Sequence, residues 1–174
     1  MRIFLIGFMG SGKTTIGKLL ADLLSFEFID TDVYIESQKG SSVSQIFDIE
    51  GEEAFRKLET HTLIQLIKKE NVVIATGGGM PCFNSNMALI NDLGYTFYLY
   101  TRTKELTRRL VASDGSVRPL LEGLGDEEAL RSFIGNKLLE RERYYFSSQY
   151  LIDCNKTKEQ VVEEIYSEYS FLQV

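Results

Sequence analysis

The sequence is poor in histidine and cysteine, the residues on which many nucleophilic and metal-dependent sites depend. Its 174 residues include one histidine, His61, and two cysteines, Cys82 and Cys154, which lie far apart and without the spacing of metal ligands. His61 falls in the middle of an expected helix, where we interpret it as structural, so Ser-His-Asp and Cys-His catalysis have no candidate centre. Two idle thiols indicate a reduced protein, and the cytoplasm is the expected compartment.

Long apolar runs and an excess of positive charge are also absent. No run reaches the roughly 20 residues that cross a bilayer. The apolar residues 2–6 lead directly into a glycine-rich loop, which favours a buried strand over a signal peptide. The formal net charge of −6 argues against nucleic-acid partners and against binding to anionic membranes. We therefore expect a single domain over residues 1–174, a monomer that binds small molecules, with any anionic ligand held by locally concentrated Lys and Arg.

What the chain does contain is a phosphate-binding loop. Residues 7–14 read GFMGSGKT and fit the P-loop pattern G-x-x-x-x-G-K-[ST]. The strand expected over residues 2–6 precedes this loop, and apolar residues at helical spacing follow it over residues 13–25, which is the context that the motif needs. Backbone N–H groups of the loop and of the helix N-terminus would point at phosphate oxygens. Lys13 would reach the outer phosphates, and the Thr14 hydroxyl would bind Mg²⁺.

Strand and helix patterns alternate along the whole chain. This alternation predicts an α/β fold in which helices cover both faces of a five-stranded parallel sheet, a three-layer α/β/α arrangement. The expected strands cover residues 2–6, 26–29, 72–75, 95–100 and 149–152. The expected helices cover residues 13–25, 33–50 with a break near Gly40 and a cap at Ser42 or Ser44, 52–70, 85–93, 103–112, 126–146 and 158–170. Residues 113–125, with three glycines and Pro119, are expected to form a mobile loop.

Polar or glycine-rich clusters follow the first three expected strands, at the carboxyl ends where parallel sheets bind ligands. Asp30 and Asp32 follow the second strand, and in an extended segment their side chains would project to the same side. One carboxylate would help to hold Mg²⁺ and the other would contact an acceptor hydroxyl, although either could instead cap the next helix. Gly77, Gly78 and Gly79 follow the third strand. They would permit positive φ and close approach of the backbone to a ligand, or they form a flexible loop.

Several arginines are candidates for anion binding, and each has a simpler alternative. Arg56 and Glu59 are neighbours on one helix face, either as a fork for a carboxylate oriented by Glu59 or as an ordinary surface ion pair. Arg118 lies in the glycine-bearing loop, either as a lid residue brought onto transferring phosphates or as an exposed side chain. Arg108 and Arg109 could stack on a nucleotide base or belong to a solvated helix face.

In this order, the motifs resemble those of the shikimate kinase family over almost the whole chain. The matching elements are GFMGSGKTT at 7–15, DTD at 30–32, FRKLE at 55–59, TGGG at 76–79, RPLL at 118–121 and R-x-x-x-Y at 141–145. The resemblance implies a P-loop NTPase fold of the nucleoside-monophosphate-kinase type, with five parallel strands and a mobile lid at about 113–125. It also implies ATP-dependent phosphorylation of the 3-hydroxyl of shikimate, on the route to chorismate and aromatic amino acids.

On the nucleotide side, the resemblance implies a site formed by the P-loop and the lid. The ATP phosphates would be held by Gly10, Ser11, Gly12, Lys13, Thr14 and Thr15. Mg²⁺ is the expected cofactor, bound by Thr14 and, through water, by Asp30, with ATP as the co-substrate. Arg118 would reach ATP from the lid, and the adenine would lie between the Arg108/Arg109 region and the loop at 153–157. The expected catalytic residues are Lys13, Asp32 and Arg118.

On the acceptor side, the resemblance implies a site formed by helices at about 32–62 and by a late helix. The residues implied at the substrate are Asp32, Arg56, Glu59, Gly78, Gly79 and Arg141. Asp32 would bind the shikimate hydroxyls and act as the base, the two arginines would hold the carboxylate, and Glu59 would orient Arg56. The family often has Pro-Leu where this chain has Glu142-Arg143-Tyr144, so Arg143 is a second candidate. The spacing to Tyr145 favours Arg141, whose acidic neighbours would by themselves indicate a solvated face.

Two other functions fit parts of the pattern. Another small P-loop kinase, for instance one acting on gluconate, would also need cations for a hydroxy acid. A GTPase-type switch would need an Asn-Lys-x-Asp guanine motif, and the segments that begin at Asn136 and Asn155 both lack its Asp. An Asp-x-x-Gly match at 48–51 does not follow an apolar strand.

Overall fold

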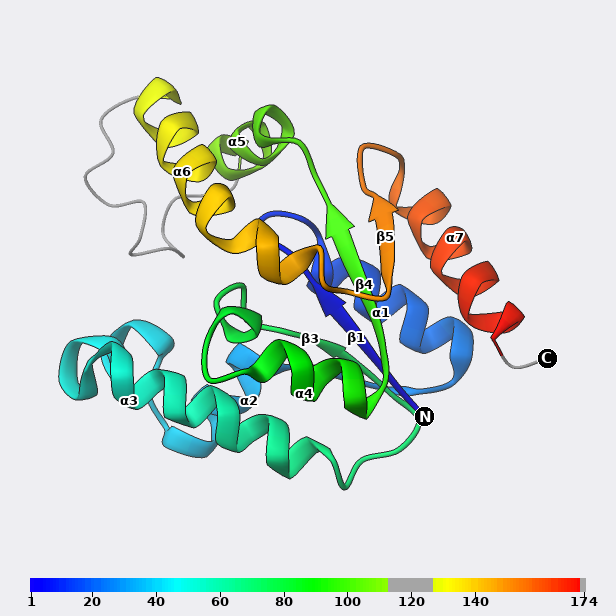
Figure 1. The fold of residues 1–174 in the computed structure, drawn as a ribbon, viewed down its shortest axis with the longest axis horizontal. Coiled ribbons are helices and arrows are strands. Elements are labelled where there is room, and N and C mark those ends of the chain that lie inside the picture. Colours follow the sequence, from blue (N-terminus) through cyan, green and yellow to red (C-terminus); the bar gives the residue numbers. More distant parts are fainter. Residues whose placement is uncertain (113–126, 173–174) are drawn as a thin grey trace.

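The computed structural model describes residues 1–112 and 127–172 (Figure 1). The expected lid at 113–125, with Arg118, lies outside the described residues. The strands are β1 (Arg2–Ile6), β2 (Glu27–Asp30), β3 (Val72–Ala75), β4 (Tyr95–Tyr100) and β5 (Tyr150–Asp153). The helices are α1 (Lys13–Leu24), α2 (Thr31–Lys39), α3 (Val43–Leu66), the short 3₁₀ helix η1 (Met80–Cys82), α4 (Asn86–Leu93), α5 (Thr103–Ala112), α6 (Glu127–Tyr145) and α7 (Lys158–Phe171).

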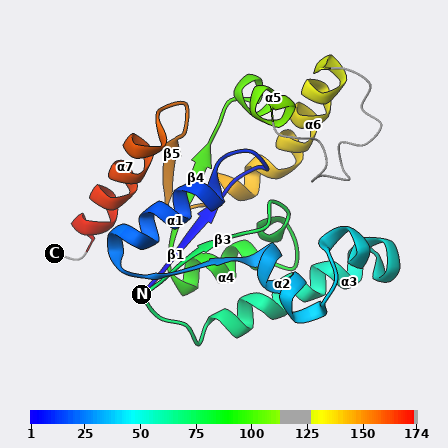
Figure 2. The same cartoon turned by 180° about the vertical axis from the view of Figure 1, so that it is seen from behind.

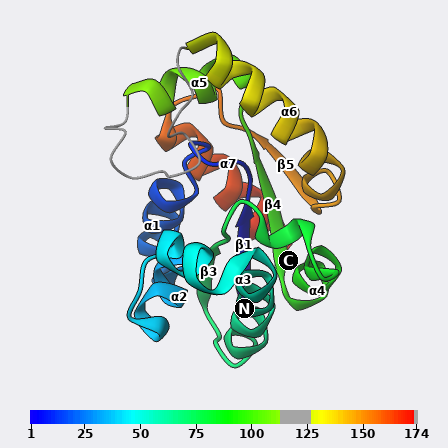
Figure 3. The same ribbon diagram turned by 90° about the vertical axis from the view of Figure 1, so that its left-hand side faces the viewer.

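The five strands form one parallel sheet in the order β2-β3-β1-β4-β5, which confirms the expected α/β fold. Seen from behind, α1 and α7 cover one face of the sheet (Figure 2), and α3 and α4 lie on the opposite face (Figure 3). Successive residues of a strand point to opposite faces. Ile3 and Leu5 of β1 accordingly pack in the apolar cluster with α1 and α7, whereas Phe4 and Ile6 pack in the cluster with α3, α4 and α6. A central strand buried on both sides explains the continuous apolar run at the start of the chain.

The register of the sheet aligns the strand ends that carry the polar and glycine-rich clusters. Ala75, the last residue of β3, pairs with Leu5 of β1 and with Asp30 of β2. The P-loop follows β1 directly and the glycine turn at 76–79 follows β3, so both begin at the edge of the sheet where Asp30 ends β2. The expected convergence of these three clusters on one edge is therefore confirmed.

The helices after β2 differ most from the expectation. The first one begins at Thr31, two residues early, because Asp30 caps it by accepting a hydrogen bond from the Asp32 N–H. Ser42 caps α3 through a capping box with Gln45, which confirms one of the two expected caps. Within α3 the backbone is non-helical at Gly51, where φ is 82° and ψ is 167°, so two helical segments meet there at a kink. The division expected between residues 50 and 52 is therefore confirmed, whereas the second segment ends at Leu66 and not at residue 70.

Both cysteines lie in described parts of the structure. Cys82 is half-buried and Cys154 is buried, and both are free thiols. Burial raises the pKa of the Cys82 thiol to about 11 and that of Cys154 to about 12, so both thiols are protonated at neutral pH. Across residues 1–112 and 127–172, no helix combines the length and the apolar character needed to cross a membrane.

Candidate active site at the carboxyl edge of the sheet

The P-loop has the backbone conformation of a phosphate cradle. Gly10 and Gly12 have φ values of 81° and 99°, which side-chain-bearing residues rarely adopt, and Gly12 is the N-cap of α1. Lys13 Nζ donates to the carbonyl oxygens of Gly7 (2.7 Å) and Phe8 (2.9 Å), so the lysine folds back over the loop. The loop therefore presents a helix N-terminus and an ammonium group at the same place, as an anion site requires.

Asp30 has two partners, one on each carboxylate oxygen. Its Oδ1 accepts the Asp32 N–H (3.1 Å) as the cap of α2, and its Oδ2 accepts the Thr14 hydroxyl (2.8 Å). The interpretation of Asp30 as a helix cap is therefore confirmed, and the same carboxyl group also contacts the P-loop. The expected extended geometry of residues 30–32 is wrong, because Asp32 lies in the first turn of α2 and does not share a strand face with Asp30.

A hydroxyl and a carboxylate at this distance fit Mg²⁺, which prefers oxygen ligands and keeps several waters. Among residues 1–112 and 127–172, no group of three or more His, Cys, Asp or Glu side chains could enclose a metal ion. Thr14 Oγ1 and the Asp30 carboxylate are the two neighbouring oxygen donors that could hold such an ion together with other ligands.

The carboxylate of Asp32 is crowded by the glycine turn. A Cβ atom at Gly77 would lie 2.5 Å from Asp32 Oδ1 and 3.1 Å from Glu59 Oε1, so a side chain there would displace the Asp32 carboxylate. The Gly77 N–H donates to Thr31 Oγ1 (2.8 Å), which holds the turn against the start of α2. Burial and the nearby negative charge of Asp30 raise the pKa of Asp32 to about 6, although Lys13 opposes this shift.

Space distinguishes Gly77 and Gly79 from Gly78, where a Cβ atom would meet its neighbours at ordinary contact distance. None of Gly77, Gly78 and Gly79 has a positive φ, which corrects the expectation that they would. A Cβ atom at Gly79 would lie 2.5 Å from Arg56 Nη1, and one at Gly78 would lie 3.5 Å from Arg141 Nη1. The turn therefore brings its backbone against the side chains of the candidate acceptor site.

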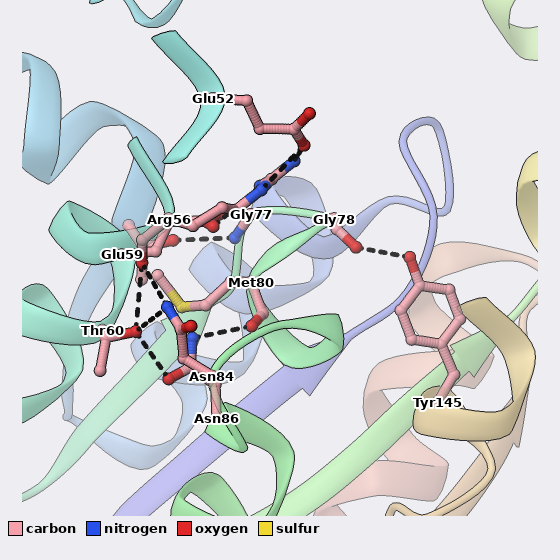
Figure 4. Close-up of polar contacts among 11 residues, drawn as sticks. Glu52, Arg56, Glu59, Thr60, Gly77, Gly78, Met80, Asn84, Asn86 and Tyr145 are labelled. Carbon is pink, nitrogen blue, oxygen red and sulfur yellow. Dashed lines mark hydrogen bonds and ion pairs between the residues drawn. The ribbon is translucent and has the colours of Figure 1, made fainter. Parts of the chain in front are cut away.

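Arg56 is held by two carboxylates of the same helix (Figure 4). Its Nη1 donates to Glu59 Oε2 (2.8 Å), and its Nε (3.2 Å) and Nη2 (2.8 Å) both donate to Glu52 Oε1. The Arg56 and Glu59 side chains are only 11% and 1% exposed, so theirs is not the ordinary surface pair that the spacing alone allowed. Aromatic rings surround the guanidinium, and the nearest is that of Phe83, whose ring centroid lies 4.2 Å from Arg56 Cζ.

Burial of Glu59 raises its pKa to about 7, although Arg56 opposes this rise. Burial alone would also lower the pKa of Arg56, but its ion pairs with Glu59 and Glu52 outweigh that effect, and the pKa of Arg56 is raised. Arg56 thus remains charged, and without Arg56 the pKa of Glu59 would rise further.

The two late arginines have different surroundings. Arg141 lies beside Gly78 and over the ring of Phe8 in the P-loop, 5.5 Å from its centroid. Arg143 is exposed and lies over the ring of its neighbour Tyr144. The spacing to Tyr145 therefore favoured Arg141, which is the one of the two arginines that lies at the glycine turn. Tyr145, at the end of the same motif, donates its hydroxyl to the Gly78 carbonyl (2.6 Å) and fixes the turn from the side of α6 (Figure 4).

Arg109 braces the P-loop. Its Nη1 donates to the carbonyls of Gly10 (3.3 Å) and Ser11 (3.4 Å), and its Nη2 donates to the carbonyl of Cys154 (3.0 Å). This places the loop after β5 beside the P-loop, where the adenine was expected. Arg108 instead forms an exposed pair with Glu105.

Sequence reasoning missed a polar brace between α3 and the segment after the glycine turn (Figure 4). Asn84 Nδ2 donates to the Arg56 carbonyl (3.2 Å) and to Thr60 Oγ1 (3.1 Å), and Thr60 Oγ1 donates to Asn86 Oδ1 (3.0 Å). Asn86 in turn donates to the Met80 carbonyl (2.9 Å). No sequence signal marks these contacts, because they join segments far apart in the chain. Glu52, also missed, carried a signal in its i,i+4 spacing to Arg56.

Fold and site together define a small-molecule kinase of the P-loop class, and comparison with known proteins identifies the family. The family model of shikimate kinase matches residues 9–170. A shikimate kinase of Parabacteroides distasonis is 46% identical over 155 residues, which cover 89% of this chain and 88% of the relative. The chain belongs to the shikimate kinase family, as the resemblance implied.

Solved structures agree with this assignment. The crystal structure of shikimate kinase from Bacteroides thetaiotaomicron covers 98% of both chains with 38% identity and a TM-score of 0.93. Shikimate kinase from Acinetobacter baumannii in complex with shikimate is 34% identical, with a TM-score of 0.87 and coverage of 99% of this chain and 94% of that chain. A gluconokinase from Sinorhizobium meliloti is 14% identical with a TM-score of 0.55, so it shares the fold alone.

Proposed function

We propose that this chain transfers the γ-phosphoryl group of ATP to the 3-hydroxyl of shikimate, giving shikimate 3-phosphate and ADP on the route to chorismate. Family membership supports the reaction class. One observation carries the proposal for this chain's own residues: the Cβ position of Gly78 lies 3.5 Å from Arg141 Nη1 and 3.6 Å from the carbonyl oxygen of Gly7 in the P-loop. An anion held by Arg141 would thus lie next to phosphates held by the loop.

On the nucleotide side, Gly10, Ser11, Gly12, Lys13, Thr14 and Thr15 would bind the phosphates, and Arg109 would hold the loop in shape. Mg²⁺ fits Thr14 and Asp30, and when bound it would neutralise charge on the phosphate oxygens. Lys13 would turn from the loop carbonyls to the outer phosphates. Arg118, implied by the resemblance, lies outside the described residues and stays a sequence-based prediction.

On the acceptor side, Arg56 and Arg141 would hold the shikimate carboxylate while the backbone of Gly78 and Gly79 contacts the ring. Glu59 would fix the Arg56 fork from behind. Asp32 would bind hydroxyls and take the proton of the attacking one, a role that suits a carboxylate with a pKa near 6. Transfer depends mostly on alignment and on charge neutralisation, so the base need not be strong.

The test is coupled ADP release with shikimate, with gluconate and without acceptor, each with and without Mg²⁺. We expect release that depends on both shikimate and Mg²⁺, with the phosphate at the 3-position by ³¹P NMR. Equal turnover of gluconate would favour the other small-molecule kinase. Tight GTP binding without acceptor turnover would favour a switch protein.

The remaining proposals concern organisation. We propose a single domain over residues 1–174, in which the helices at about 32–62 form the acceptor-binding part and about 113–125 the lid. We also propose a monomer in the cytoplasm. Free cysteines at both described positions support a reducing compartment.

A further inference from the structure

Arg56 has an inner and an outer carboxylate partner, and the two differ sharply in exposure. The Glu59 side chain is 1% exposed and holds Nη1, whereas the Glu52 side chain is 58% exposed and holds Nε and Nη2. Glu59 is thus fixed inside the protein, while the carboxylate of Glu52 is open to solvent and can leave Arg56 when another anion takes its place.

Glu52 occupies the edge of the guanidinium that a ligand carboxylate would use. Arginine recognises carboxylates best through two parallel N–H groups, and the Nε–Nη2 edge offers such a pair. At the other end Nη1 is held by Glu59 and lies against the Gly79 backbone. The ring of Phe83 covers the guanidinium at 4.2 Å from its centroid. Among these neighbours the exposed Glu52 is the partner that can move (Figure 4).

We propose that Glu52 is a placeholder in the acceptor site: its carboxylate occupies the outer edge of Arg56 until the carboxylate of the acceptor displaces it. This inference rests on the proposed function and adds a residue that determines specificity. The exchange replaces one carboxylate by another, so the charge around Arg56 is conserved. A neutral ligand cannot make this exchange, because it would leave the guanidinium with fewer anionic contacts than Glu52 provides.

The placeholder competes with the substrate, so its removal strengthens acceptor binding. Ion pairs with one exposed partner contribute up to about 1 kcal/mol, which corresponds to a factor of about five in affinity. The Glu52→Gln variant is therefore expected to lower the KM and the dissociation constant for shikimate about two- to fivefold. Glutamine keeps the size of the side chain and can still accept a hydrogen bond, so the variant mainly removes the charge.

The matched control is Glu53→Gln. Glu53 lies on the same turn of α3, carries the same charge, and pairs with Lys57 at 2.7 Å with both side chains largely exposed. Any general effect of removing one negative charge near an anionic substrate appears in both variants. We expect the KM of Glu53→Gln to stay at the parent value, so that the difference between the variants isolates the contact with Arg56.

The ligand is varied as well, by measuring the affinity of methyl shikimate, in which the carboxylate is a neutral ester. The placeholder predicts that Glu52→Gln gains affinity for shikimate and none for the ester. An equal gain for both ligands, an equal gain in Glu53→Gln, or an unchanged or raised KM for shikimate in Glu52→Gln would overturn the proposal. A raised KM would instead make Glu52 a residue that orients Arg56.

Failure of this inference can be told apart from failure of the proposed function. If the parent protein turned over no shikimate, the proposed function would be wrong. The displacement of Glu52 could then still be tested by observing Arg56 directly. The ¹⁵Nε resonance of Arg56 would be followed while cyclohex-1-enecarboxylate, the bare ring with its carboxylate, is added to parent and Glu52→Gln proteins. Earlier saturation in the variant supports the placeholder, and identical or later saturation contradicts it.

Discussion

The nucleotide side and the acceptor side of this site are built in different ways. The nucleotide side is one continuous stretch of backbone, from Gly7 to the start of α1, braced by Lys13 and Arg109 donating to its carbonyls. The acceptor side is assembled from side chains of α2, α3 and α6 around the glycine turn. Backbone geometry follows from a short local sequence, whereas a side-chain cluster depends on how distant segments pack.

The two sides also balance charge differently. On the acceptor side a buried arginine is matched to a buried carboxylate, Glu59, whose pKa is already raised. On the nucleotide side Lys13 donates to two backbone carbonyls, and its charge also opposes the rise in the pKa of Asp32. Changes on the acceptor side should therefore affect folding as well as binding, and they should do so in a pH-dependent way.

The largest expected effect on catalysis lies on the nucleotide side. Removing one preorganised charge that meets the developing transition state costs about 10²- to 10³-fold in turnover, so Lys13→Met should lower kcat by about that factor. Lys18→Met is the control, because Lys18 is an exposed lysine of the same helix. Steady-state ADP release measures the kcat of both variants. If the kcat of Lys13→Met were within about threefold of that of Lys18→Met, Lys13 would not be a catalytic residue.

The next largest effect is on protein stability, and it is expected for a substitution on the acceptor side. Arg56→Ala leaves Glu59 buried without its partner, at a cost of up to about 3 kcal/mol when Glu59 is ionised. A buried carboxyl with a raised pKa contributes stability that is present at low pH and lost as pH rises through its folded pKa. The free energy of unfolding of Arg56→Ala should therefore fall from about pH 6 to about pH 9 more steeply than in the parent.

Denaturant unfolding at both pH values measures this difference. Adding Glu59→Gln to Arg56→Ala should remove the extra slope, because the group that titrates is gone. A parallel pH dependence in parent and single variant would show that Glu59 is not the carboxylate responsible.

A smaller effect separates the two late arginines. Hydrogen bonds to charged groups contribute about 1.5–3 kcal/mol, so Arg141→Ala should raise the KM for shikimate about 10- to 100-fold. The KM for ATP should change little. Arg143→Ala is the matched control, since Arg143 is exposed and packs on Tyr144. Equal effects of the two substitutions on the shikimate KM would contradict the assignment of Arg141 to the carboxylate.

The smallest effect concerns pH and Asp32. With its pKa raised to about 6, Asp32 should lose the proton-accepting form as pH falls, so kcat/KM should drop about tenfold for each unit below pH 6. The stability contribution of the same group runs the other way, since it is largest below the ordinary aspartate pKa and is lost as pH rises through about 6.

Asp32→Asn should lower turnover and abolish this acidic limb of the profile. A pH–rate profile from about pH 5 to 9 tests both points. If Asp32→Asn kept turnover within a few-fold of the parent, Asp32 would not be the base.

Local patterns predicted the parts of the molecule that depend on local physics. The strands could be found because each is a short apolar run next to turn residues, and the P-loop because its motif lies between a strand and a helix. The start of α2 was missed because the capping bond from Asp30 wins over the extended geometry that the strand pattern suggested. The break at Gly51 was predicted correctly, because glycine is the residue that readily adopts the positive φ found there.

Local patterns were also insufficient for the parts of the candidate site that depend on packing between distant segments. Spacing predicted that Arg56 and Glu59 meet, but not that Glu59 is buried, because burial depends on the glycine turn packing over α3. Gly77 and Gly79 were expected to permit positive φ and close approach of the backbone to a ligand; neither has a positive φ, and a Cβ atom at either would crowd Asp32 or Arg56. Contacts such as that of Tyr145 with Gly78 join residues that are 67 positions apart, beyond the reach of any local pattern.

Asp30 makes the two sides mechanically inseparable. One oxygen of a single carboxyl group starts the helix that carries Asp32, and the other receives the hydroxyl of Thr14. A shift of Thr14 would therefore act on the same carboxyl group that caps the first turn of α2. If the loop binds a nucleotide as proposed, Asp30 is the residue through which that binding would reach Asp32.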